Sequence, residues 1–132
     1  MKRETLNILV LEPNVLQRDL IKIALTRNSM TPIICREADH LRRQLLEHRP
    51  DVLLIDTYLP GQNGLDLISQ LTLEGLLERT RIFFLSSMGY PEIVHKAAKL
   101  GASGFLVKPL DPDLLVTRIL KCFHRPGQLP MQ

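Results

Sequence analysis

The chain has 132 residues, of which 45% are hydrophobic and 23% charged, a size and composition typical of a single domain with one ordinary core. No apolar run approaches the ~18 residues of a membrane-spanning helix, and the amino-terminal residues lack a signal-peptide pattern, so we expect a cytoplasmic protein without membrane contact. The net charge is +3, but the basic residues are scattered and not interleaved with aromatic ones, so we expect no direct nucleic-acid binding by this domain.

Short apolar runs alternate along the chain with segments of helical periodicity. Five apolar runs predict β-strands, at residues 6–11, 32–35, 52–56, 81–86 and 105–107. A helix is expected after each strand, at residues 14–27, 38–48, 65–72, 91–100 and 112–122. The run at 52–55 is bounded by turn-forming residues and suits a strand buried on both faces. Residues 60–64 are rich in turn formers and predict a loop.

Residues at the expected helix ends agree with this division. Pro91 suits a first helical position, and Asp111 is expected to cap the last helix with Pro112 at its first position. After Phe123 the sequence loses its periodicity and contains prolines and a glycine. We therefore expect one domain at residues 1–124, and a tail or the start of a linker at 125–132.

Alternating strands and helices with short connections predict an α/β fold, with a doubly wound, five-stranded parallel sheet and helices on both faces. Ligands bind such folds at the carboxyl ends of the strands. The residues at those ends are Glu12, Asp56, Ser86 and Lys108. Each alone has an ordinary explanation as a turn, loop or surface residue. Their placement at one edge of the sheet predicts a functional site.

The motifs that contain these residues resemble the receiver domains of two-component response regulators, of which the chemotaxis receiver is the simplest. The resemblance covers about residues 6–124 and is specific because several motifs occur together. The matching segments are Ile8-Leu-Val-Leu-Glu12, Asp51-Val-Leu-Leu-Ile-Asp56 with Pro60-Gly61 and Gly64, Phe83-Phe-Leu-Ser86-Ser87, and Gly101-Ala-Ser-Gly104-Phe105-Leu-Val-Lys108-Pro109. The resemblance implies a flavodoxin-like fold with strand order 2-1-3-4-5 and five helices.

The resemblance also implies roles for single residues. Asp56 matches the phosphoacceptor, Lys108 the cation that pairs with the phosphoryl group, Ser86 the switch hydroxyl and Phe105 the switch aromatic residue. A histidine kinase or phosphotransfer protein would donate the phosphoryl group. The domain is not expected to be an enzyme beyond self-catalysed phosphotransfer to Asp56 and autodephosphorylation. In the family the peptide bond that matches Lys108–Pro109 is cis.

Mg²⁺ is the cofactor that the resemblance implies, held by Asp56, the backbone carbonyl of Tyr58 and acids after the first strand. The family has two adjacent acids there, whereas this chain has Glu12 and Pro13, and the second position is the usual direct ligand. A close unit charge is worth up to about 4 kcal/mol at an effective dielectric of 20, so its loss predicts weak Mg²⁺ binding. The longer side chain of Glu12 and the amide oxygen of Asn14 are two ways to compensate in part.

Two hypotheses within the family remain. The first is a receiver phosphorylated on Asp56 with an altered metal site, and the second is a pseudo-receiver that acts through protein contacts without phosphorylation. A flavodoxin-like cofactor or enzyme domain is a third hypothesis, but the segment Glu12 to Gln17 lacks the phosphate-binding loop it would need.

Phe105 stands where the family more commonly has a tyrosine. We expect it to be inward and buried even without phosphate, because exposing it would forfeit about 1.5–3 kcal/mol. The alternative is that Phe105 is an ordinary core residue without a switching role. If it is inward, partner or homodimer contacts through the fourth helix, fifth strand and fifth helix, near His95 and Lys99, should depend only mildly on phosphorylation.

Overall fold

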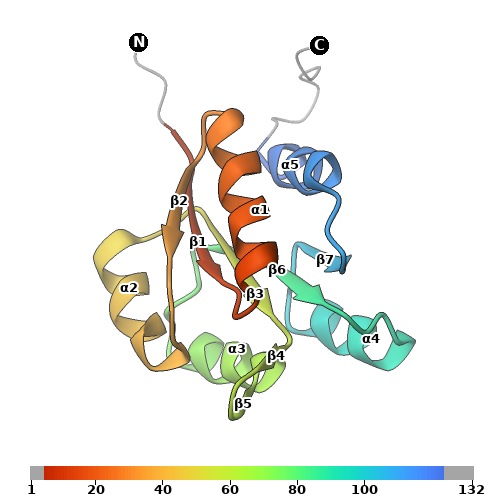
Figure 1. Ribbon diagram of the computed structural model, residues 1–132. Helices are drawn as coiled ribbons and strands as arrows, with labels where there is room; N and C mark the ends of the chain where they lie inside the picture. Colours follow the sequence, from red (N-terminus) through yellow and green to blue (C-terminus); the bar gives the residue numbers. More distant parts are fainter. Residues whose placement is uncertain (1–4, 124–132) are drawn as a thin grey trace.

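The structure, a computed structural model, describes residues 5–123 and shows one central sheet between two layers of helices (Figure 1). The strands are β1 (Asn7–Leu11), β2 (Thr31–Ile34), β3 (Val52–Asp56), β4 (Tyr58–Leu59), β5 (Gln62–Asn63), β6 (Arg81–Ser86) and β7 (Gly104–Val107). The helices are α1 (Val15–Arg27), α2 (Leu41–His48), α3 (Gly64–Leu73), α4 (Pro91–Lys99) and α5 (Pro112–Lys121), with a 3₁₀ turn (Ala38–His40) before α2. The tail predicted at 125–132 lies outside the described residues. From residue 5 to residue 123, no helix is both long and apolar enough to cross a membrane.

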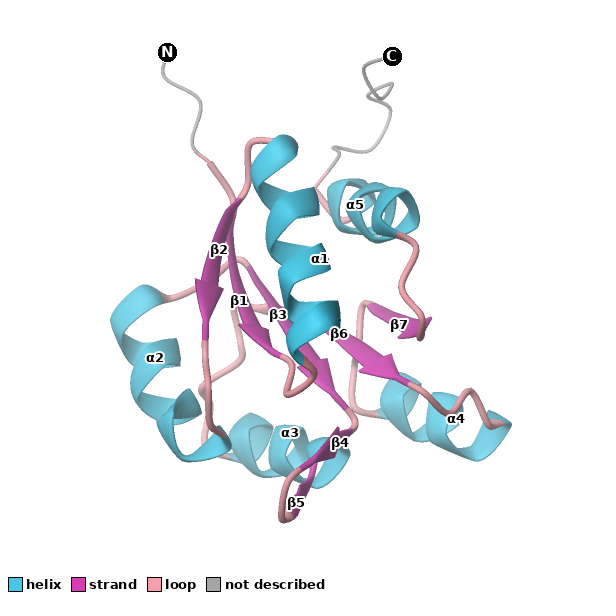
Figure 2. Ribbon diagram, in the orientation of Figure 1, coloured by secondary structure: helices cyan, strands magenta, loops and turns pink. Residues whose placement is uncertain are grey.

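The main sheet is parallel, with the order β2-β1-β3-β6-β7. This order confirms the predicted α/β, doubly wound, flavodoxin-like fold, because it is 2-1-3-4-5 when the five long strands are counted alone. β3 lies at the centre, with Ile55 opposite Leu11 of β1 and Asp56 opposite Leu85 of β6. Figure 2 shows the arrowheads of these strands ending at the same edge of the sheet.

The core has two layers because helices cover both faces of the sheet. One apolar cluster joins the sheet to α2, α3 and α4, and the other joins it to α1 and α5. Side chains alternate along a strand, so Leu53 and Ile55 belong to the first cluster whereas Val52 and Leu54 belong to the second. All of β3 is buried, as predicted from its continuous apolar run.

The segment after β3 is more ordered than the predicted loop. Tyr58–Leu59 and Gln62–Asn63 form a short antiparallel ladder, which turns at Gly61 with φ +71°. This ladder places Asn63 at the start of α3, where its side-chain oxygen accepts hydrogen bonds from the N–H groups of Leu65 and Asp66 at 2.8 and 3.2 Å. Two-residue strands carry too little alternation to be predicted from sequence.

The helix ends follow the predicted caps with small shifts. Asp111 Oδ1 accepts hydrogen bonds from the N–H groups of Asp113 and Leu114 in the first turn of α5, which confirms the predicted cap. Asn14 caps α1, since its Oδ1 accepts a hydrogen bond from the N–H of Gln17 at 2.9 Å, and α1 therefore begins one residue later than expected. The helix expected at 38–48 divides into the 3₁₀ turn and α2.

Candidate functional site

Asp56 is the last residue of β3 and is only 5% exposed. Its Oδ1 accepts a hydrogen bond from the backbone N–H of Tyr58 at 2.7 Å, and its Oδ2 accepts one from the ammonium of Lys108. Hydrogen bonds that involve a charged partner are shorter and stronger than neutral ones. The residue predicted as the phosphoacceptor is therefore fixed by a backbone amide on one oxygen and a cation on the other.

Lys108 follows β7, the edge strand that pairs with β6. Its backbone N–H donates to the carbonyl of Ser86 at 2.7 Å, and the Lys108–Pro109 peptide bond is cis, as the resemblance implied. The Nζ atom lies 2.6 Å from Glu12 Oε1 and also donates to Asp56. The fold thus brings together three of the four predicted edge residues, with the ammonium between the two acids.

Glu12 directly follows β1 and is 1% exposed. Its Oε2 accepts a hydrogen bond from the N–H of Asn14 at 2.9 Å, while Oε1 faces Lys108. Burial raises the pKa of Glu12, because the charged carboxylate loses hydration, and the hydrogen bonds from Lys108 and Asn14 lower it in part. The amide oxygen of Asn14 caps α1, so the structure does not support it as a replacement metal ligand.

Ser86 is the last residue of β6, is 2% exposed and pairs in the sheet with Val107, the residue before Lys108. Its hydroxyl is hydrogen-bonded to Thr57 and to the backbone of Met88. Among the described residues, the Ser86 hydroxyl forms no hydrogen bond with Asp56 or with Lys108. Thr57 was not predicted from the sequence, where its only signal is a hydroxyl residue directly after a strand-end acid.

Phe105 pairs with Phe84 across β6 and β7 and is half-buried. Its side chain packs against the core layer under α2, α3 and α4. The side chain is therefore turned toward the core but only partly buried, whereas the prediction was an inward and buried Phe105. Whether Phe105 switches stays a prediction, because an ordinary core residue would occupy the same place.

Glu12, Asp56 and Tyr58 are the residues predicted to hold Mg²⁺. Two carboxylates and one backbone carbonyl suit a cation that prefers oxygen ligands and keeps several waters. Exposed Pro13 offers no side-chain ligand, and across residues 5–123 no group of three or more acidic, histidine or cysteine side chains is placed to hold a metal. The oxygen chemistry of these donors suits Mg²⁺, but the protein ligands are fewer than the family has, and Lys108 lies beside both carboxylates.

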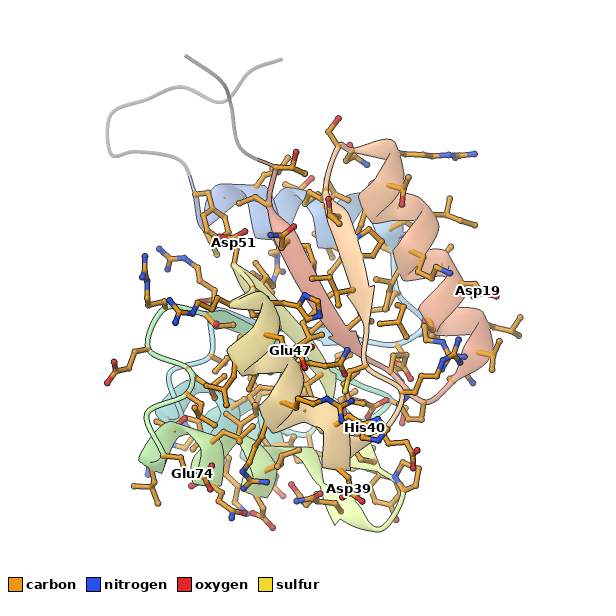
Figure 3. All side chains as sticks on the ribbon, turned by 90° about the vertical axis from the view of Figure 1, so that its left-hand side faces the viewer. Asp19, Asp39, His40, Glu47, Asp51 and Glu74 are labelled. Atoms are coloured by element: carbon orange, nitrogen blue, oxygen red, sulfur yellow. The ribbon has the colours of Figure 1, made fainter. Side chains whose placement is uncertain are left out.

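Other acids serve the fold away from this edge. Figure 3 shows Asp19, Asp51 and Glu74 separated from one another across the molecule. Asp51 precedes β3 and accepts a hydrogen bond from the N–H of Asn7 at 2.7 Å, at the opposite end of the strand from Asp56. Glu74 forms a bidentate ion pair with Arg42, with N–O distances of 2.7 and 2.9 Å. These acids therefore do not form a second acidic site.

An acid at the end of the central strand, a second acid and a shared lysine define a signalling receiver rather than a nucleotide-binding α/β domain. Residues 8–120 match the family model described as the response regulator receiver domain. The chain belongs to this family of two-component response regulators.

Individual relatives support this assignment. The chain is 30% identical over 118 residues to the phosphate regulon transcriptional regulatory protein PhoB of Escherichia coli (strain K12), a match that covers 89% of this chain and 52% of PhoB. The chain thus spans about half the length of the curated relatives it matches. The signal receiver domain of NarL from Mycobacterium tuberculosis has a TM-score of 0.81 at 27% identity, over 91% of this chain and 97% of that chain. CheY4 of Vibrio cholerae, at 19% identity and a TM-score of 0.80 over 89% of this chain and 98% of that chain, is similar in fold.

Proposed function

We propose that this domain accepts a phosphoryl group on Asp56 from a histidine kinase or a phosphotransfer protein. The observation that carries the proposal is the contact of the buried Asp56 carboxylate with Lys108, whose ammonium also pairs with Glu12. Membership of the receiver family supports it. In this proposal the domain is a recipient of phosphotransfer, with no enzyme activity beyond self-catalysed transfer and autodephosphorylation.

The Asp56 carboxylate has the chemistry of a nucleophile. One of its oxygens attacks the phosphorus, an acyl phosphate P–O bond forms, the bond from phosphorus to the donor imidazole nitrogen breaks, and that nitrogen takes up a proton. The rate of such a transfer depends mainly on positioning and on neutralising the charge of the equatorial oxygens. Lys108 would supply one positive charge, because its Nζ already contacts Asp56.

Mg²⁺ is part of the proposal, and its role when bound is to supply further positive charge at the phosphoryl oxygens. We propose Glu12, Asp56 and the backbone carbonyl of Tyr58 as its ligands. The hydrogen bond from the Tyr58 N–H to Asp56 Oδ1, at 2.7 Å, keeps that backbone beside the carboxylate. We propose that binding is weak because Pro13 removes one carboxylate.

Asp56→Asn tests the proposal directly. Wild-type protein incubated with acetyl phosphate and Mg²⁺ should gain the mass of one phosphoryl group, whereas the variant should gain none, because an amide is not a competent nucleophile here. Asp66→Asn, which removes an exposed acid of α3, is the matched control and should label like the wild type. The readout is intact mass. No adduct on wild-type protein at high Mg²⁺ would overturn the proposal and favour the pseudo-receiver.

Pro13→Asp should tighten Mg²⁺ binding by about tenfold or more, because it restores a carboxylate beside Glu12 and a tenfold change needs only ~1.4 kcal/mol of a Coulombic term of up to about 4. Asn14→Asp is the matched control, since it adds the same charge one residue later while an aspartate still caps α1. Calorimetric titration with Mg²⁺ provides the affinities. Equal affinities for Pro13→Asp and wild type would show that the missing carboxylate does not limit the site.

The remaining parts of the proposal concern partners and location. We propose cytoplasmic action through protein contacts, without direct nucleic-acid binding by this domain. A homodimer through α4, β7 and α5 is supported by exposed apolar side chains on all three, Val94 at 37%, Val107 at 51% and Leu114 at 41%. A homodimer that covered these side chains would gain from the removal of apolar surface from water.

A further inference from the structure

The hydroxyl of Ser86 is saturated with hydrogen bonds in a buried position. Thr57 Oγ1 donates to Ser86 Oγ at 2.8 Å, the N–H of Met88 donates to it at 3.0 Å, and Ser86 Oγ donates to the carbonyl of Met88 at 3.0 Å. A serine hydroxyl has one proton to donate and two lone pairs that accept. These three bonds therefore use its whole capacity.

A phosphoryl group on Asp56 presents oxygens that act mainly as acceptors, so Ser86 can bind it only by donating its single proton. That proton is committed to the carbonyl of Met88 while Thr57 and the Met88 N–H occupy both lone pairs. Contact between Ser86 and the phosphoryl group therefore requires this arrangement to break.

The backbone of Thr57 is held on both sides. Its N–H donates to the carbonyl of Leu85 at 2.9 Å, and its carbonyl accepts from the N–H of Gly64 at 2.8 Å. Thr57 is 7% exposed and Ser86 is 2% exposed. If Ser86 turned away, the Thr57 hydroxyl would be left buried without this partner, which is costlier than the loss of an exposed hydrogen bond.

We propose that Thr57 is a positioning residue that holds the Ser86 hydroxyl in the arrangement of the unphosphorylated domain and so sets the threshold for switching. This inference rests on the proposed function, because phosphorylation of Asp56 is the event that draws Ser86 away. Removal of the Thr57 hydroxyl would free one lone pair of Ser86 and abolish the cost of leaving a hydroxyl unpaired. The domain would then reach its phosphoryl-bound arrangement more readily.

Two substitutions separate the hydroxyl from the shape of the side chain. Thr57→Val keeps the shape and removes the donor, whereas Thr57→Ser keeps the donor and removes a methyl group. If the hydroxyl sets the threshold, Thr57→Ser should behave like wild type and Thr57→Val should differ. A purely space-filling Thr57 predicts the opposite pattern.

The experiment is a titration of the wild type and of each variant with beryllofluoride, a phosphoryl mimic, in the presence of Mg²⁺, followed through the backbone amide resonances of Met88 and Lys108. The Thr57→Val variant should bind the mimic more tightly by on the order of fivefold, the effect of one net buried hydrogen bond on an equilibrium constant. In the free domain, the same variant should show on the order of fivefold faster hydrogen exchange of the Met88 amide, because its acceptor, Ser86 Oγ, is no longer held in place by Thr57.

The outcomes are distinguishable. Absence of any response of the wild type to beryllofluoride would overturn the proposed function, and this inference with it. If the wild type responds but Thr57→Val binds the mimic no more tightly than wild type, or if Thr57→Ser changes as much as Thr57→Val, the inference alone is overturned. Tighter binding by Thr57→Val, with faster exchange at Met88 and wild-type behaviour of Thr57→Ser, would establish it.

Discussion

Lys108→Met should lower the free energy of unfolding by about 3 kcal/mol at neutral pH, because it removes a cation that two buried carboxylates share. Loss of one partner from a buried ion pair costs about 3–5 kcal/mol. The lower end is expected because the Lys108 side chain is 14% exposed and Glu12, whose pKa is raised by burial, can take up a proton instead. Urea unfolding measures the effect. Lys99→Met, at an exposed position of α4, is the control and should stay within about 0.5 kcal/mol of wild type.

The loss of stability caused by Lys108→Met should depend on pH, and the pKa of Glu12 fixes the direction of that dependence. Burial raises the pKa of Glu12 above its ordinary value of 4.5, so the folded domain binds that proton more tightly than the unfolded chain does. The contribution of Glu12 to stability is therefore largest below pH 4.5 and decreases as the pH rises through the folded-state pKa. Lys108 lowers the pKa of Glu12, so Lys108→Met should raise that pKa further. The loss of unfolding free energy relative to wild type should therefore increase as the pH rises. A difference that is absent at neutral pH, or that narrows with rising pH, would contradict the role of Lys108 as a bridge.

Gly64→Ala should destabilise the domain by about 3 kcal/mol or more, the upper end of the usual range for overpacking. A Cβ atom at Gly64 would lie 2.2 Å from the carbonyl oxygen of Asp56 and 3.0 Å from the Cα of Thr57. Both neighbours are backbone atoms, so the end of β3 would have to move. Urea unfolding should show the loss of stability, and intact mass after acetyl phosphate treatment should show a lower yield of adduct.

Gly61→Ala is the matched control for this substitution. Gly61 has φ +71° and no atom within 4 Å of an added Cβ, so the expected loss is only the backbone cost of about 1–2 kcal/mol for a left-handed alanine. Its adduct yield should equal that of wild type. Similar losses for the two variants would show that close approach to Asp56 is not what requires glycine at position 64.

The parallel sheet was predictable because local signals agreed, and its strand order was implied by the resemblance to receiver domains. The apolar run from Val52 to Ile55 has the length and flanking residues of a strand buried on both faces, and the structure places helices on both sides of it. Asp56 and Lys108 could be assigned to one site because the carboxyl ends of parallel strands share an edge. Glu12 and Asp56 follow the adjacent strands β1 and β3, whereas Lys108 follows β7, which is separated from β3 by β6, so its long side chain spans that strand to contact both acids.

Finer features had no comparable signal. The short ladder of β4 and β5 depends on pairing between residues three and five positions apart, which leaves no periodic pattern. Ser86 could be placed at the edge, but the partners of its hydroxyl could not, because a hydroxyl rotates to whichever donors and acceptors surround it. Asn14 was a candidate ligand in the sequence and is a helix cap in the structure, since both roles use the same amide oxygen.

The measurement that tests the central claim most directly is the position of the phosphoryl group. Wild-type protein is incubated with acetyl phosphate and Mg²⁺, the acyl phosphate is reduced with borohydride, which converts a phosphorylated aspartate to homoserine, and the peptides are sequenced by mass spectrometry. Our account predicts homoserine at position 56 and unmodified aspartate or glutamate at all other acidic positions. Reduction at another acid without reduction at position 56 would contradict it.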